Sequence, residues 1–110
     1  MKLTVDNNCI LANGGRIKAA HEVLQAVQVG VRVYVIYDYM EFPNELPARN
    51  LFAYDLTGAE LWRAQDIGCG SIDAYTNFIA EEPLTVYNFG CFICVVSEDN
   101  GYILSTQFTK

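Results

Sequence analysis

Few residues in this chain have the type and spacing that catalysis requires. The one histidine, His21, has no acidic or nucleophilic side chain at a motif distance, so we expect it to face solvent rather than act as a general base. Paired carboxylates can serve glycoside hydrolysis when a fold holds them about 5 to 9 Å apart. Each pair here falls in an expected loop or turn, where charges are solvated: Glu41 with Glu45, Glu81 with Glu82, and Glu98 with Asp99. We therefore predict no catalytic residues and a protein that is not an enzyme.

Four cysteines raise the question of a metal site or of disulfides. They are Cys9, Cys69, Cys91 and Cys94, and the last two have the C-x-x-C spacing of many zinc sites. That pair lies in CFICVV, which predicts a β-strand, and side chains three residues apart on a strand point to opposite faces. We expect no export signal in MKLTVDNN, so the thiols should stay reduced. The expectation is small apolar thiols, with no metal and no cofactor.

The elements that must position any site are β-hairpins, and two of them have similar sequence patterns. Residues 51–62, LFAYDLTGAELW, and residues 92–104, FICVVSEDNGYIL, each place an acidic turn ending in glycine between two apolar runs. In the first, Asp55 opens the turn and Gly58 supplies the left-handed conformation of a bulged hairpin. Gly58 and Gly101 are 43 residues apart. This period is typical of four-stranded meanders of the propeller-blade kind.

Two further hairpins are predicted around these. The β-rich runs Glu22–Gln28 and Val31–Tyr39 flank Gly30, and the runs Asn77–Ala80 and Leu84–Asn88 flank a turn with a proline. In the Val-rich run the odd-numbered residues share one apolar face at period two. Its even-numbered residues are mixed, which predicts a face that is only partly covered.

One segment leaves two structures open. In RIKAAHEVLQAV, residues 16–27, apolar residues recur at helical spacing, which favours a short helix over about Arg16–Ala26. A strand is favoured for its second half, because it runs straight into the Val-rich hairpin. The fold class predicted is all-β or β-dominated α+β, one domain over residues 1–110. It holds two four-stranded antiparallel meanders, at about 20–65 and 75–109, packed as a sandwich or barrel.

Composition and charge limit the partners. Apolar residues make up 52% of the chain and charged ones 18%, more apolar surface than a small domain hides easily, so we predict a homodimer. The net charge of −6 argues against nucleic acid and anionic membranes, and favours a basic protein as partner. No stretch approaches the roughly 20 apolar residues of a membrane span. We expect the protein in the cytoplasm.

The C-terminal two thirds resembles a known family. RNLFAYDLTGAELWR, DAYTNF, LTVYNFGCF and NGYILSTQFTK follow one another in the order seen in small uncharacterised bacterial β-meander proteins. The resemblance covers about residues 22–110, while the N-terminal 20 residues depart from the pattern. It implies an isolated β-meander protein of accessory type, such as those encoded by mobile, integron-type gene cassettes. The family has no established activity, so the resemblance implies no catalytic residues.

Two functions stay open on these observations. The first is a non-enzymatic protein-binding or immunity-type module, whose acidic loops and exposed aromatics would meet a basic partner. Its predicted surface consists of Glu41, Phe42, Glu45, Tyr75, Glu81, Glu82 and Phe89. The alternative is a small-molecule-binding β-barrel with an aromatic pocket. Its predicted pocket consists of Tyr34, Tyr37, Asp38, Tyr39, Arg49 and Trp62.

Trp62 also has a structural interpretation. It ends the clearest hairpin, and an indole in that place usually packs against the adjoining strand or meander. We expect a core anchor whose removal costs about 3 to 5 kcal/mol.

Overall fold

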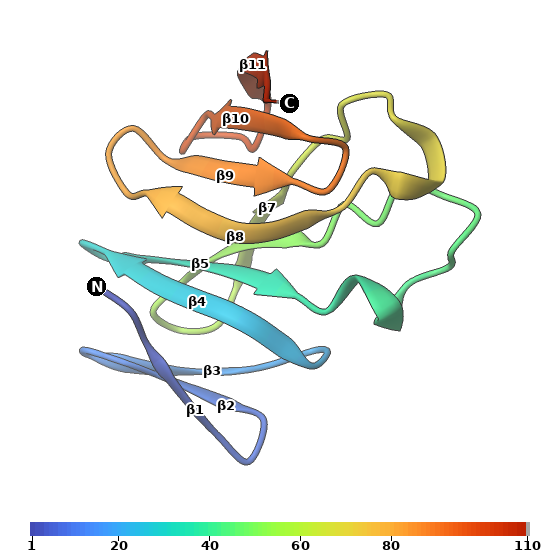
Figure 1. Ribbon diagram of the computed structural model, residues 1–110. Helices are drawn as coiled ribbons and strands as arrows, with labels where there is room; N and C mark the ends of the chain where they lie inside the picture. The colour runs from blue at the N-terminus through green and yellow to red at the C-terminus, as the bar shows by residue number, and fades with distance from the viewer. Residues whose placement is uncertain (110) are drawn as a thin grey trace.

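The computed structural model describes residues 1–109, which form three antiparallel sheets (Figure 1). The N-terminal sheet consists of β1 (Thr4–Asp6), β2 (Cys9–Ala12) and β3 (Gly15–Lys18). The central sheet consists of β4 (Val23–Val29), β5 (Arg32–Tyr37), β6 (Leu51–Asp55) and β7 (Glu60–Arg63). The C-terminal sheet consists of β8 (Tyr75–Ala80), β9 (Thr85–Asn88), β10 (Phe92–Val96) and β11 (Ile103–Phe108). Two short 3₁₀ turns, η1 (Tyr39–Glu41) and η2 (Gly70–Ile72), lie in the loops.

The β-dominated fold and its two four-stranded meanders agree with the prediction. In each meander the strands pair in chain order, as consecutive hairpins do. Gly58 and Gly101 both have positive φ, at 91° and 77°, as their turns require. The sheets pack face to face and do not close into a barrel. The N-terminal sheet was not predicted as a unit, because its strands are three or four residues long and mix polar with apolar side chains.

The helix considered for residues 16–27 does not form. Ile17 lies in β3, fully buried and paired with Ile10, and the segment then turns and enters β4. Neighbouring residues of β4 point to opposite faces: Ala26 packs in the core shared with the N-terminal sheet and Val27 in the core shared with the C-terminal sheet. The helical spacing was therefore a coincidence of two short strands that each bury apolar residues.

The central sheet is covered on both faces, as Figure 1 shows for the strands between the other two sheets. Tyr34 and Ile36 of β5 pack toward the C-terminal sheet, and Val33 and Val35 pack toward the N-terminal sheet. All four are fully buried. On the even-numbered face, which was predicted to be only partly covered, Tyr34 and Ile36 are fully covered by a second layer, while Arg32 and Asp38 at its ends are half-buried.

Asn50 ties the central sheet to the C-terminal sheet. Its Nδ2 donates to the backbone oxygens of Tyr37 (2.6 Å) and Tyr75 (2.7 Å), and its Oδ1 accepts from the backbone nitrogen of Tyr75 (2.8 Å). The side chain is fully buried. One amide thus satisfies three backbone groups and aligns the strand ends from which the loops depart.

Candidate functional site

Three loops from different parts of the chain gather at one end of the molecule. They are residues 38–50, residues 64–74 and the turn around Phe89, on the right of Figure 1. Backbone hydrogen bonds join them: Ala48 donates to Asp73 (2.9 Å), and Phe89 donates to Ala74 (2.7 Å). The end of the molecule is therefore one connected surface rather than three separate loops.

The first loop is held by a cap and an arginine. The Asp38 carboxylate accepts from the backbone nitrogen of Met40 (2.9 Å) and so starts η1. The Arg63 guanidinium lies 5.5 Å from the centre of the Phe42 ring and donates to the backbone oxygen of Arg49 (2.8 Å). Burial, and then the charge of Arg49, lower the pKa of Arg63.

The second loop is organised by a buried carboxylate. Asp73 is almost fully buried, and its oxygens accept from the backbone nitrogens of Ile67 (2.7 Å) and Cys69 (3.0 Å). The side-chain amide of Asn88 donates to it as well (2.8 Å). Asp73 thus provides hydrogen-bond acceptors for backbone nitrogens in an irregular segment. These hydrogen bonds make the burial of its carboxylate possible.

Apolar side chains lie exposed on these loops. We define the loop-end surface as Tyr39, Met40, Phe42, Pro43, Leu46 and Phe89. All but Phe89 line one cavity of about 310 Å³, and the Phe89 ring centre is 6.0 Å from that of Tyr39. The exposed fractions are 78% for Met40, 59% for Leu46 and 54% for Phe89. Large apolar residues this exposed, and gathered from separate loops, make this surface a candidate binding site.

Acidic residues and the histidine border this surface. Glu41 and Glu45 are exposed on the same loop. His21 is half-buried rather than facing solvent: its ring centre is 4.6 Å from that of Phe42, and its Nδ1 is 3.8 Å from Glu41 Oε1. Sequence reasoning missed this pair because its members are 20 residues apart on different elements.

The predicted partner surface is brought together only in part. Glu41, Phe42, Glu45 and Phe89 lie at the loop end. Tyr75 is fully buried beneath it, and its hydroxyl donates to the backbone oxygen of Gln65.

The remaining two residues of that prediction lie elsewhere. Glu81 and Glu82 are in the turn between β8 and β9, at the opposite end of the molecule (Figure 1). The expected single surface is therefore divided between two ends, because each hairpin reverses the chain.

The predicted aromatic pocket does not form from its six residues. Tyr34 and Trp62 stack with ring centres 5.7 Å apart in the core next to the C-terminal sheet. Tyr37 points to the opposite core and its hydroxyl lies 2.6 Å from that of Tyr54. Tyr39, Asp38 and Arg49 belong to the first loop. The four aromatic side chains thus occupy three environments, and Trp62 is a buried core residue.

The cysteines do not form a shared site. Cys91 precedes β10 in an exposed turn with positive φ, so only Cys94 lies in the strand in which both were expected. Cys94 is buried, and that burial raises the pKa of its thiol to about 11. Within residues 1–109, no three side chains of His, Cys, Asp or Glu are grouped as metal ligands.

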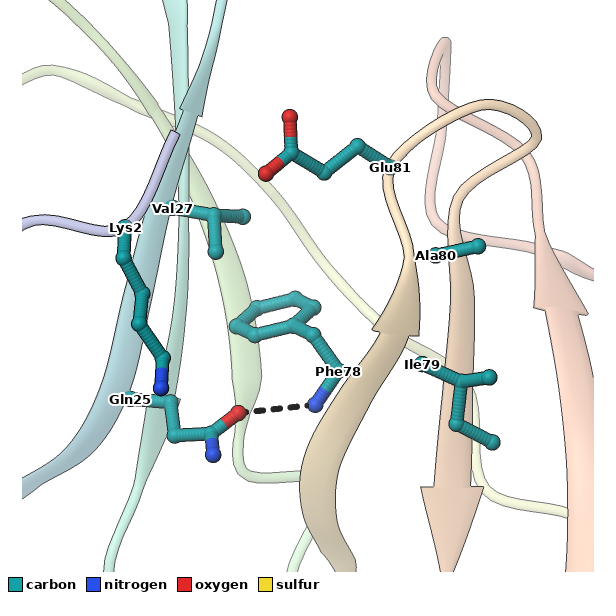
Figure 2. A pocket seen from close by; sticks show the side chains of 7 residues that line it. All are labelled: Lys2, Gln25, Val27, Phe78, Ile79, Ala80 and Glu81. Atoms are coloured by element: carbon teal, nitrogen blue, oxygen red, sulfur yellow. Dashed lines mark hydrogen bonds between the residues drawn. The ribbon is translucent and has the colours of Figure 1, made fainter.

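A cleft of about 370 Å³ separates β4 from β8 (Figure 2). Lys2 and Glu81 approach it from opposite walls, and Phe78 forms its apolar side. Gln25 bridges the walls, with its Oε1 accepting from the backbone nitrogen of Phe78 (2.8 Å). The cleft has one positive and one negative side chain near an aromatic ring, and the Glu81 carboxylate pairs with the Met1 ammonium (2.6 Å).

The stacked sheets and the loop-end surface define a layered β-meander protein with an exposed apolar end. Over residues 1–109 no helix combines the length and apolar character needed to cross a membrane. The chain belongs to the family described as Domain of unknown function (DUF7957), whose model matches residues 1–108. The match includes the N-terminal sheet. No curated protein matches the chain.

Proposed function

We propose that this protein is a non-enzymatic, accessory protein-binding module of the cytoplasm and that the loop-end surface is its binding site. The observation that supports this most is the exposure of Met40 and Leu46 at one cavity, with Phe89 exposed beside it against Tyr39. A few well-placed apolar and aromatic side chains carry most of the affinity of a protein interface. Their loops are fastened by Asp73 and Arg63, so little order has to be gained on binding.

The charge around the surface indicates the chemistry of the partner. Glu41 and Glu45 are exposed beside the apolar residues, and the whole chain has a net charge of −6. Electrostatic attraction would speed association with a basic protein and fix its orientation. The partner proposed is therefore a basic protein with an apolar protrusion that enters the cavity.

Affinity capture from a lysate of the native cell tests this function. The bait is the parent chain or the double variant Met40→Ser/Phe89→Ser. The control is Val31→Ser/Leu61→Ser, which changes two exposed apolar residues, one in the β4–β5 turn and one on β7. We expect parent and control to retain a basic protein that the double variant loses. Equal capture by all three, or no captured protein, would contradict the proposal.

A second candidate function is binding of a small zwitterion in the cleft between β4 and β8. The observation that favours it is the placement of Lys2 and Glu81 on opposite walls (Figure 2), where the ammonium of a ligand with both charges would displace the Met1 ammonium from Glu81. Without a closed barrel, this cleft rather than the tyrosine cluster is where such a ligand would bind. Chemical shifts recorded during titration with free amino acids should move at Gln25 and Phe78, and should not move in Lys2→Ala.

A further inference from the structure

The three sheets have six edge strands, and five of them are protected against pairing with another chain. The outer edge of β4 pairs with residues 1–3, where Leu3 donates to Ala26 (2.8 Å). The edge strand β8 is interrupted by two bulges and receives the Gln25 side chain. Charged residues lie on the remaining three: Asp6 on β1, Arg16 and Lys18 on β3, and Glu60 and Arg63 on β7. Such devices are how proteins prevent unwanted strand addition.

β11 has none of these protections beyond its first residue. Its sequence, ILSTQF, contains neither charge nor proline. The Gln65 side chain covers the backbone nitrogen of Ile103 (3.1 Å), and the one bulge lies at the same end of the strand. The other five residues of β11 are exposed, with exposed fractions of 66% for Leu104 and 58% for Phe108.

The pairing with β10 identifies the backbone groups that point outward. Thr109 donates to the backbone oxygen of Cys91 (2.7 Å), so residues 107 and 105, at alternate positions, also bond toward β10. Thr106 and Phe108 therefore direct their N–H and C=O groups away from the sheet. Among residues 1–109 no hydrogen-bond partner lies against these two outward positions.

We propose that β11 pairs antiparallel with β11 of a second copy of this chain, with the two-fold axis close to Thr106. The pairing joins two C-terminal sheets into one continuous sheet of eight strands, four from each copy. It satisfies the outward groups of Thr106 and Phe108 in both copies. It also brings exposed apolar side chains of the two strands, such as Leu104 and Phe108, next to one another.

The charge distribution favours a second copy over a basic partner at this edge. Each copy has a net charge of −6, so two copies repel one another least where neither presents a charge. A basic protein would find no carboxylate on β11 to bind. An antiparallel strand edge is complementary to itself, which a two-fold symmetric dimer requires.

Sedimentation equilibrium of the purified chain, and of three variants, tests the pairing. We expect a mass twice the 12.3 kDa of the chain for the parent. Thr106→Lys, which places two like charges near the axis, should weaken the dimer by about tenfold or more. Thr106→Pro removes only an outward N–H and should do the same without breaking the bonds to β10. Leu61→Lys, on the already charged edge β7, should leave the mass unchanged.

Near-ultraviolet circular dichroism accompanies each run and verifies that the variants are folded. If one variant at Thr106 does not fold, the other provides the comparison. A parent chain that is monomeric at every concentration would overturn the proposal. A dimer that both folded variants retain at parental affinity would overturn it as well.

Discussion

Gly101 lies so close to Trp62 that a Cβ atom at position 101 would be 2.5 Å from Cε3 of the indole. The contact joins the turn between β10 and β11 to the edge of the central sheet. The indole Nε1 donates to the backbone oxygen of Glu98 in the same turn (2.8 Å). These contacts join the two meanders. Gly101 occupies the same turn position in the C-terminal meander as Gly58 does in the central one.

Gly101→Ala should destabilise the protein by about 3 kcal/mol, because it combines a clash in the core with a φ of 77° that alanine adopts poorly. The measurement is urea unfolding. Gly30→Ala is the matched control: its φ is 62°, but nothing lies within 4 Å of the added Cβ. That variant should lose only about 1 kcal/mol. Equal losses would show that the indole moves aside at no cost.

Trp62→Ala should lose about 3 to 5 kcal/mol, since it empties a buried site and leaves Arg32 Nη1 as the remaining donor to the Glu98 oxygen. Far-ultraviolet circular dichroism in urea is the readout, because the variant has no tryptophan to report by fluorescence. Leu61→Ala, at the exposed neighbouring position, should lose less than about 1 kcal/mol. A Trp62→Ala variant as stable as this control would contradict the role of the indole as a core anchor.

Asn50→Ala should lose about 2 to 4 kcal/mol. The variant removes the hydrogen-bond partner of three buried backbone groups: the nitrogen and the oxygen of Tyr75 and the oxygen of Tyr37. Each buried polar group without a partner lowers the stability of the folded protein. Thermal unfolding compares it with Asn44→Ala, which changes an exposed residue of the first loop and should cost under about 0.5 kcal/mol. Asn50→Asp keeps the acceptor for the Tyr75 nitrogen but, when ionised, has no donor and turns a buried charge toward two carbonyl oxygens, so it should lose at least as much as Asn50→Ala.

Stability should decline as the pH rises above about 10. Burial, with the Glu98 carboxylate second, raises the pKa of Tyr34 from 10.0 to about 12. Burial also raises the pKa of Tyr54 and of Tyr75. The unfolded chain therefore releases these protons first, so the stabilisation is complete below pH 10 and is lost as the pH rises through the folded-state value.

Urea midpoints measured at steps of pH between about 8 and 12 test this decline. Tyr34→Phe is the comparison, because it removes one of the groups and should make the decline shallower. A midpoint that stays level up to pH 12 in the parent would contradict the expected order of ionisation.

Local interactions explain what could be predicted from the sequence. The hairpin at Asp55 forms from its own residues, since the Asp55 carboxylate accepts from the backbone nitrogens of Thr57 (2.9 Å) and Ala59 (3.1 Å). The Asp55 carboxylate also accepts from the Thr57 hydroxyl (2.6 Å). This bond, followed by those from the backbone, lowers the pKa of Asp55. Period-two apolar runs and turn glycines likewise depend only on neighbouring residues. The two meanders could therefore be predicted from the sequence.

The remaining features depend on which sheet covers which face. The sequence alone determined strand-forming runs, turn positions and an acidic net charge, because each is a property of neighbouring or summed residues. Only the tertiary structure decided that Tyr75 is buried, that Tyr34 and Tyr37 face different cores, and that β11 is the exposed edge. Burial arises when distant segments remove one another from water, and no short stretch of sequence contains that information.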